Sequence, residues 1–513
     1  MDFDLVIKIV MLVLFFGVMV GVGIYCRKNA TDVSGFVLGG RSVGPWLTAF
    51  AYGTSYFSAV IFIGYAGQFG WKFGIASTWI GIGNALIGSL LAWVILGRRT
   101  RIMTQHLNSS TMPEFFGKRF NSKALKIGAS IITFIFLIPY TASLYNGLSR
   151  LFTMAFGIPY EWCIVAMSVL TGIYVIAGGY MATAINDFIQ GIIMIIGIVA
   201  VIAAVLMNQG GFEAALHKLA EVPSETPGAF NSFFGPEPLN LLFVVILTSL
   251  GTWGLPQMVQ KFYAIKHEND IKKGTIISTA FALVVAGGCY FLGGFGRLFN
   301  VDVAKTGFDA IIPEMLSGLP SLLIAVVVIL VLSASMSTLS SLVIASSSTL
   351  TIDLLKDNVV KKMDEKKQVR FIRVFIVVFI AISAFIAIYQ AQSKTLFIAQ
   401  LMGVSWGALA GAFLAPFLFG LYWKKTTKLA CWVCFIFGTC FMLFNMCCNL
   451  FAKDLLPQFL QSPINCGAIT MLAGLVIVPV VSLISPKPDK QLVEDAFACY
   501  DKKVQASQKN SLD

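Results

Sequence analysis

Long apolar stretches, separated by short polar segments, recur along nearly the whole chain. Each contains about twenty residues or more, which is enough for a helix to cross a hydrocarbon core of about 30 Å. Thirteen such stretches predict membrane-spanning helices: 4–26, 44–68, 76–97, 124–153, 160–178, 183–207, 239–261, 274–298, 318–352, 371–391, 396–422, 427–450 and 465–485. The pattern therefore predicts an all-α polytopic membrane protein.

Composition and charge agree with this prediction. The chain has 513 residues, of which 57% are hydrophobic and 12% charged, whereas soluble domains are about 25% charged. Its net charge of +12 comes mainly from Lys and Arg in alternate loops, such as the segment from Lys261 to Lys273. This positive-inside bias places the N-terminus outside and the C-terminus in the cytoplasm, in agreement with an odd number of spans. The basicity reflects topology, and we expect no nucleic-acid partner.

The remaining segments are short. The first span is interpreted as retained, because it is too long for a signal peptide's apolar region and no cleavage site follows it. Segments 98–123 and 353–370 are predicted as cytoplasmic helical connectors and 208–238 as an external loop. Residues 1–485 are expected to form one transmembrane domain, and 486–513 a poorly ordered cytoplasmic tail. There is no GxxxxGK[ST] phosphate-binding loop, which argues against an ATP-driven pump.

Two predicted spans contain residues that interrupt a helix. Span 44–68 carries Gly53 and several hydroxyl side chains near mid-depth, and span 239–261 carries Gly251, Gly254 and Pro256. Pro removes a backbone donor and Gly makes unwinding easy. Either span could simply be kinked for packing. However, irregular backbone in a membrane persists only where protein or a water-filled cavity satisfies it, and two interrupted spans five apart are typical of an inverted-repeat transport site.

Polar side chains also gather inside two other spans. Six hydroxyls occur in SASMSTLSS, Ser333–Ser341, where Ser337, Ser340 and Ser341 share one helical face with Thr338 beside it. Such hydroxyls can bond to the carbonyl four residues earlier and allow close packing, but their oxygens are also suitable ligands for an alkali cation. Asp187 is the one carboxylate well inside a predicted span, which marks it as a functional candidate unless it lies near the cytoplasmic interface.

Three motifs, in this order, carry a family resemblance: FVLGGRSVGPW (36–46), AGGYMATAINDFIQG (177–191) and ASMSTLSS (334–341). Over about residues 5–485 the chain resembles the solute:sodium symporter family, in particular bacterial members near the sodium/proline symporters. The resemblance implies a secondary active transporter of the plasma membrane, not an enzyme, with a leucine-transporter-type fold. It also implies inverted five-helix repeats at about 44–207 and 239–422, extra helices at 4–26, 427–450 and 465–485, and function as a monomer.

The resemblance further implies sodium sites. Family positions for the first Na⁺ match the carbonyls of Thr54, Phe57 and Ala334 and the hydroxyls of Ser337 and Thr338. Some sialic acid carriers of the family bind a second Na⁺, whose ligands match Asp187, Ser337, Ser340 and Ser341. We therefore expect Na⁺ as the coupling ion, with two ions per cycle as an open possibility.

For the solute, Ser58 and Tyr140 match pocket residues of the sodium/proline symporter. Tyr56, Thr252, Trp253 and Gln257 are further candidates at or beside the helix breaks, although Thr248 and Thr252 stand where that symporter has Trp and Tyr. We expect a small organic solute, either an amino acid such as proline or a small carboxylate. A sugar or sialic acid is the alternative solute, and a non-accumulating solute sensor is the alternative function.

Overall fold

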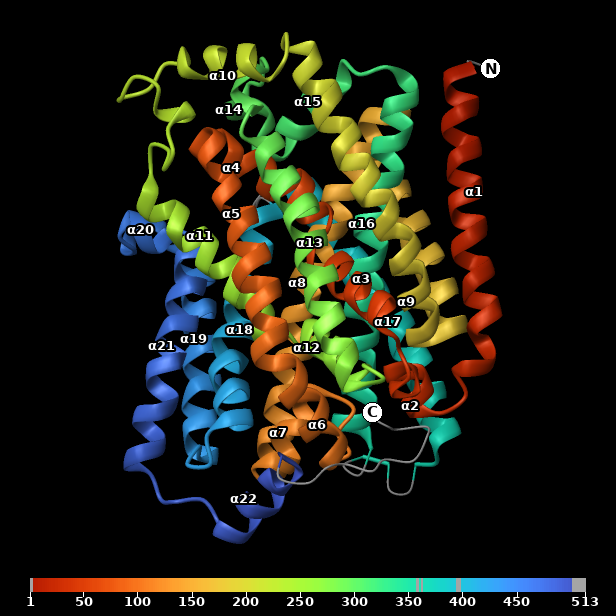
Figure 1. The fold of residues 1–513 in the computed structure, drawn as a ribbon, viewed down its shortest axis with the longest axis vertical. Helices are drawn as coiled ribbons and strands as arrows, with labels where there is room; N and C mark the ends of the chain where they lie inside the picture. The colour runs from red at the N-terminus through yellow and green to blue at the C-terminus, as the bar shows by residue number, and fades with distance from the viewer. Residues whose placement is uncertain (1–2, 357–358, 361–362, 394–397, 501–513) are drawn as a thin grey trace.

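The structure, a computed structural model, describes residues 3–356, 359–360, 363–393 and 398–500, and this part of the chain is almost entirely helical (Figure 1). Ten of the described helices are long and apolar enough to cross a membrane, or eleven when a bent pair is counted as one span. The prediction of an all-α polytopic protein is confirmed. The number of thirteen spans and the orientation of the termini stay predictions.

The long helices form the body of the bundle. They are α1 (Phe3–Tyr25), α8 (Lys123–Phe156), α9 (Tyr160–Asn208), α13 (Glu268–Gly293), α16 (Ser321–Ser348), α17 (Glu365–Ser393), α18 (Ile398–Tyr422), α19 (Lys428–Phe451) and α21 (Pro463–Ile484). Shorter helices connect or precede them: α2 (Val33–Leu38), α3 (Pro45–Tyr56), α4 (Ala66–Phe73), α5 (Thr78–Gly83), α6 (Arg98–His106), α7 (Met112–Arg119), α10 (Phe212–Ala220), α11 (Pro238–Leu250), α12 (Pro256–Tyr263), α14 (Val303–Thr306), α15 (Ile311–Ser317), α20 (Gln458–Gln461) and α22 (Lys490–Phe497).

Helix α16, which carries the hydroxyl cluster, lies in the centre of this bundle. It packs against α3, α8, α9 and α17, and 78% of its most apolar window is buried, compared with 22% for the window in α1. Figure 1 accordingly shows α1 at one flank and α19 and α21 at the opposite flank. The cluster therefore faces protein on all sides, and lipid does not reach it.

Gly179 divides α9 into two arms. Its φ of 56° and ψ of −149° lie in a region that is essentially restricted to glycine, and a Cβ atom there would lie 2.9 Å from the carbonyl oxygen of Phe36. The break falls between the predicted spans 160–178 and 183–207, so the two arms correspond to them.

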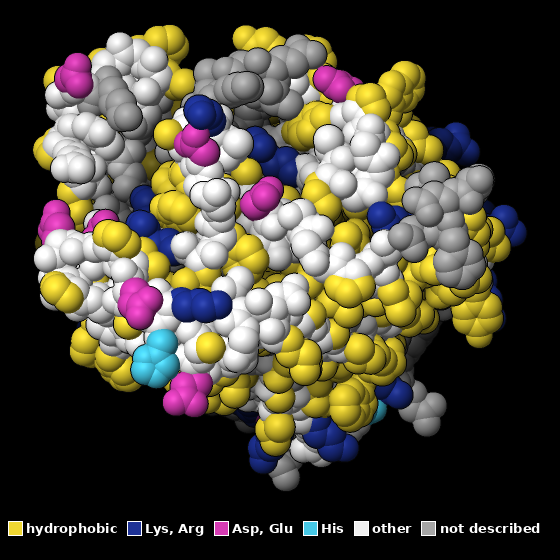
Figure 2. All heavy atoms as spheres, turned by 90° about the horizontal axis from the view of Figure 1, so that it is seen from above, with side chains coloured by type: hydrophobic (Ala, Val, Ile, Leu, Met, Phe, Trp, Pro, Cys, Tyr) yellow, Lys and Arg dark blue, Asp and Glu magenta, His cyan; other side chains and the backbone are white. Residues whose placement is uncertain are grey.

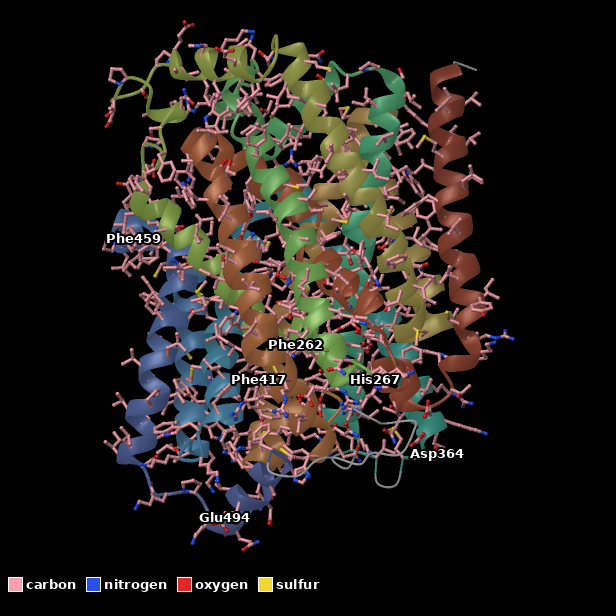
Figure 3. All side chains as sticks on the ribbon, viewed as in Figure 1. Phe262, His267, Asp364, Phe417, Phe459 and Glu494 are labelled. Carbon is pink, nitrogen blue, oxygen red and sulfur yellow. The ribbon has the colours of Figure 1, made fainter. Side chains whose placement is uncertain are left out.

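Connecting segments and the short helix α22 gather at one end of the bundle (Figure 1). Figure 3 places His267, Asp364 and Glu494 there, and Figure 2 shows the opposite end, where charged and hydrophobic side chains are interspersed. Segment 98–123 forms α6 and α7, as predicted, whereas the segment 208–238 contains α10.

The expectation of a poorly ordered tail is wrong for residues 490–500. Helix α22 buries Phe497 under the guanidinium of Arg119, 4.9 Å from the ring centre. The Tyr500 hydroxyl donates hydrogen bonds to the carbonyls of Arg99 and Leu421. The few apolar side chains of this short segment lie on one face and pack against α6 and α7.

Candidate ion and solute sites

The predicted break in the second apolar stretch is present just after α3. The helix ends at Tyr56, Phe57 has extended backbone (φ −100°, ψ 96°), and residues 60–65 continue as a π-helix. The N–H of Val60 bonds to the Ser58 hydroxyl at 3.2 Å instead of to the α3 backbone. Carbonyl groups in the last turn of α3 are therefore available to partners on other helices.

Two hydroxyls of α16 meet these carbonyls. Ser337 Oγ donates to the carbonyl of Thr54 at 3.0 Å, and Thr338 Oγ1 contacts the same oxygen at 3.2 Å and the Ser55 carbonyl at 3.3 Å. Both hydroxyls also lie within 3.2 Å of the Ala334 carbonyl. Carbonyls and hydroxyls from α3 and α16 thus converge on one small volume.

This oxygen cluster fits a sodium ion chemically. The Thr54 and Ala334 carbonyls already point toward it, and the two hydroxyls can rotate their protons away and present lone pairs. The ligands are uncharged, so an ion would be held without a buried carboxylate that would oppose its release. Phe57, the fifth predicted ligand, follows at the break and lines the same cavity as Ala334.

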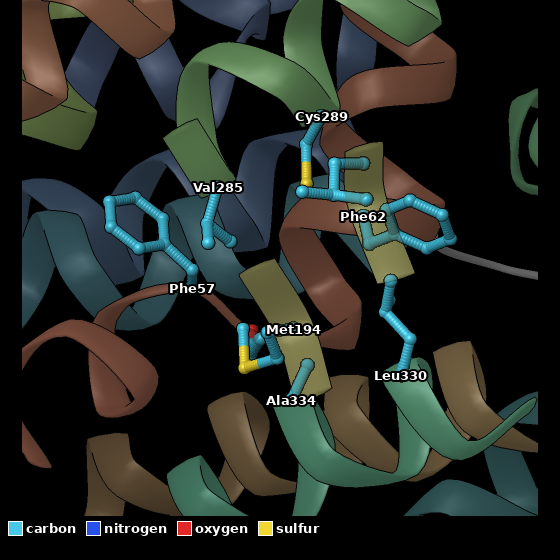
Figure 4. A pocket seen from close by; sticks show the side chains of 9 residues that line it. Phe57, Phe62, Met194, Val285, Cys289, Leu330 and Ala334 are labelled. Carbon is cyan, nitrogen blue, oxygen red and sulfur yellow. The ribbon is translucent and has the colours of Figure 1, made fainter. Parts of the chain in front are cut away.

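That cavity has a volume of about 10 Å³ and lies between the break after α3, the π-helix 60–65, α9, α13 and α16 (Figure 4). Its lining is mostly apolar and comprises Phe57, Ser58, Phe62, Met194, Ile198, Val285, Cys289, Leu330 and Ala334. A space of this size holds about one water molecule. The structure is therefore closed at this point, and a solute could enter only if these helices moved apart.

Two of the four residues predicted for a second sodium ion, Asp187 and Ser341, contact a lysine. Lys261 Nζ lies 3.7 Å from Asp187 Oδ2 and donates a hydrogen bond of 2.8 Å to Ser341 Oγ. Ser340 Oγ instead donates to the Ser337 carbonyl at 2.9 Å. The assignment of Lys261 to a cytoplasmic loop is wrong, because it lies in α12 with a side chain that is 2% exposed.

The remaining hydroxyls of the cluster serve helix packing. Ser335 Oγ bonds to the Val331 carbonyl four residues earlier, at 2.7 Å. Ser333 Oγ is buried and has no hydrogen-bond partner within the described part of the chain. Ser340 and Ser341 also bond back to the carbonyl of Ser337. Only part of the cluster reaches another helix.

The second predicted break separates α11 from α12, which are bent by 43°. Leu255 is extended and Pro256 occupies the first turn of α12, where its missing N–H costs nothing. The side chains at this break bond to residues 84–91: Trp253 Nε1 donates to the Ile87 carbonyl at 3.0 Å and Thr252 Oγ1 to the Gly88 carbonyl at 3.1 Å.

Part of the predicted solute set forms one aromatic cluster. Tyr56 and Tyr140 both pack against Trp406 of α18, with ring centres 6.0 and 5.9 Å away. Tyr140 is fully buried, and its hydroxyl has no hydrogen-bond partner within the described residues. Trp406 was not among the predicted solute residues, because an aromatic residue on an apolar helix has no local signal that separates a ligand contact from packing.

Gln257 lies in the first turn of α12. Its side chain is 1% exposed, and neither its amide oxygen nor its amide nitrogen has a hydrogen-bond partner among the described residues. A buried amide of this kind is costly unless it is satisfied in another state or by a ligand. Gln257 is therefore a strong solute-contact candidate on physical grounds.

The chain is similar to known transporters over most of its length. The osmoregulated proline transporter OpuE of Bacillus subtilis is 28% identical over 495 residues, which cover 94% of this chain and 96% of that protein. A sodium/proline symporter of Staphylococcus aureus is 30% identical over 434 residues, 82% of each chain. The structure of a Na⁺-coupled sialic acid symporter superposes with a TM-score of 0.70 at 16% identity, covering 94% of this chain and 99% of that one.

These similarities establish the fold and the family of the protein. The structural likeness shows that the fold is of the leucine-transporter type. The profile of the sodium:solute symporter family matches residues 36–438. The chain thus belongs to the sodium:solute symporter family, and it is a multi-pass protein of the plasma membrane that transports a small solute together with Na⁺ and is not an enzyme.

Proposed function

We propose that this transporter carries L-proline, or a small amino acid close to it, into the cell by alternating access. The observation that supports coupling to Na⁺ is the convergence of the Ser337 and Thr338 hydroxyls with the Thr54 carbonyl, directly beside the break in α3. Sodium bound there holds α16 against α3 and fixes the carbonyl groups of the break. Ion and solute then strengthen each other's binding reciprocally.

The chemistry of the solute region supports an amino acid. Tyr56, Tyr140 and Trp406 offer an aromatic surface for an apolar ring or side chain. Gln257 offers an unpaired amide at the N-terminal end of α12, where the helix dipole favours a carboxylate. The relatives named above are proline transporters at 28–30% identity.

We also propose thirteen spans, with the N-terminus outside and the C-terminus in the cytoplasm. The ten long helices become thirteen spans when α9 is divided at Gly179, when the 47-residue stretch Val60–His106 is divided at Gly74 (φ 61°), and when the bent pair α11–α12 is added. The inverted repeats, about 44–207 and 239–422, then each begin with a broken helix. We also propose that the protein acts as a monomer, as its resemblance to the family implies.

Uptake into proteoliposomes tests the solute assignment. With an inward Na⁺ gradient, tritiated L-proline should accumulate above its external concentration, and it should not do so when K⁺ or choline replaces Na⁺. Unlabelled carboxylates, sugars and sialic acid serve as competitors. Competition by a sugar or sialic acid with no effect of amino acids would overturn the assignment, as would binding without accumulation, which is the behaviour of a sensor.

A further inference from the structure

A buried ammonium group lies where a second sodium ion was expected. Lys261 Nζ is 3.7 Å from Asp187 Oδ2, 2.8 Å from Ser341 Oγ and 5.1 Å from the centre of the Tyr180 ring. Carboxylate, hydroxyl and aromatic face are all favourable neighbours of an ammonium group. Two of the four predicted ion ligands, Asp187 and Ser341, therefore already contact the positive charge of Lys261.

The charges at this point are removed from solvent. The side chains of Lys261 and Asp187 are 2% and 1% exposed, and they come from α12 and α9 in the middle of the helix bundle. One carboxylate compensates one cation here. A sodium ion added beside the ammonium would leave a net positive charge in a region of low dielectric constant, where two cations repel each other strongly.

We propose that the ammonium group of Lys261 takes the place of the second sodium ion, so that one Na⁺, bound at Thr54 and Ser337, is coupled to each solute molecule. This inference rests on the proposed function. A lysine is tethered to the protein and returns with it in every cycle, so its charge is not delivered to the cytoplasm. The Na⁺ gradient can then drive solute accumulation only through the entry of one Na⁺ per solute molecule, not two.

Hydrogen bonds connect the ammonium group to the proposed sodium site. Ser341 Oγ, which accepts from Lys261, lies 2.7 Å from Ser55 Oγ at the end of α3. The Ser55 carbonyl in turn accepts from Thr338. Lys261 thus helps to hold α16 against α3, as an ion bound between the same helices would do. It is a positioning residue for the first ion and excludes the second.

Counting bound ions tests this inference without any knowledge of the solute. Purified full-length protein in detergent is equilibrated with ²²Na⁺, and the bound Na⁺ per chain is measured at saturation. The wild type should bind one ion. K261A, which leaves the Asp187 carboxylate without a counter-ion, should bind two Na⁺ ions. If K261A does not fold, K261M is measured in its place. K261R keeps a cation and should bind one, and K261A/D187N, which removes both charges, should also bind one.

The control is K266A, which removes an exposed cation five residues further along the chain and should leave the count at one. Two ions bound to the wild type would overturn the inference without any variant, as would a count of one for folded K261A or K261M. A wild type that binds no Na⁺ would instead contradict the proposed function. T338A in the K261A background should raise the Na⁺ concentration that half-fills one of the two sites about 10- to 100-fold and leave the other site unchanged, which separates the two sites.

Discussion

Ser337 on α16 donates a hydrogen bond of 3.0 Å to the carbonyl of Thr54, a residue 283 positions earlier in the chain and in the last turn of α3. This contact joins the central hydroxyl helix to the helix that breaks at Phe57. It is also the geometric core of the proposed ion site, because the Thr338 hydroxyl meets the same carbonyl at 3.2 Å.

Replacing Thr338 by Ala should weaken Na⁺ binding. The variant loses one oxygen ligand, and a loss of about 1.5–3 kcal/mol corresponds to a roughly 10- to 100-fold higher Na⁺ concentration for half-maximal uptake. Solute uptake measured over a range of Na⁺ concentrations checks this. S335A is the matched control on the same helix, because its hydroxyl bonds only within α16. An unchanged Na⁺ requirement in T338A would contradict the site.

Replacing Gln257 by Ala should affect transport more than stability. The buried amide makes no hydrogen bond within the described residues, so its removal should leave the melting temperature unchanged or raised. If the amide contacts solute, loss of one hydrogen bond should raise the KM for L-proline about tenfold.

The control for this variant is Q260A on the same helix. Gln260 Nε2 donates to the Val37 carbonyl at 3.3 Å, so Q260A should lower the melting temperature and leave the KM unchanged. A Q257A protein that is less stable but has an unchanged KM would place Gln257 in the framework of the protein and not in the solute site.

Replacing Gly179 by Ala should destabilise the break in α9. The backbone conformation there costs about 1–3 kcal/mol for a residue with a side chain, and the new Cβ would clash with the Phe36 carbonyl. We expect a lower melting temperature and a lower yield of folded protein. G172A is the control in the same helix, since the nearest atom to its Cβ is 3.6 Å away. Equal stability of the two variants would show that the break is not rigid.

Replacing Arg41 by Lys should loosen the loop between α2 and α3. Arg41 has a left-handed φ of 53°, and its guanidinium donates to the carbonyls of Ser109 and Tyr263 at 2.6 and 3.1 Å. Burial lowers the pKa of Arg41 to about 10, so it remains charged at neutral pH. A lysine cannot supply the planar fork of donors, and we expect a loss of about 1–3 kcal/mol.

A thermal unfolding experiment at neutral pH measures this loss. R27K is the control, because Arg27 is an exposed cation in the short helix Cys26–Asn29 that follows α1. Equal melting temperatures for R41K and R27K would mean that the hydrogen bonds of Arg41 do not contribute to the stability of this closed arrangement.

Several features of the protein follow from local sequence alone. A membrane requires long apolar helices, so the hydrophobic pattern predicted the helical bundle. Pro256 and the extended residue before it end one helix and start another whatever surrounds them, so the break between α11 and α12 was also predictable. The hydroxyl cluster on α16 could be recognised because six polar groups in nine apolar-helix positions are unusual.

Contacts between distant helices were decided by the tertiary structure. Lys261 ends an apolar stretch, and one-dimensional hydropathy therefore places it at the membrane surface. The bend between α11 and α12 instead turns it inward to Asp187. The docking of α22 under Arg119 and Arg99 depends likewise on residues nearly 400 positions away. The sequence determines which polar groups lie along each helix. The packing of the helices determines which of these groups come into contact, because a buried charge or hydroxyl is stabilised only by its neighbours in space.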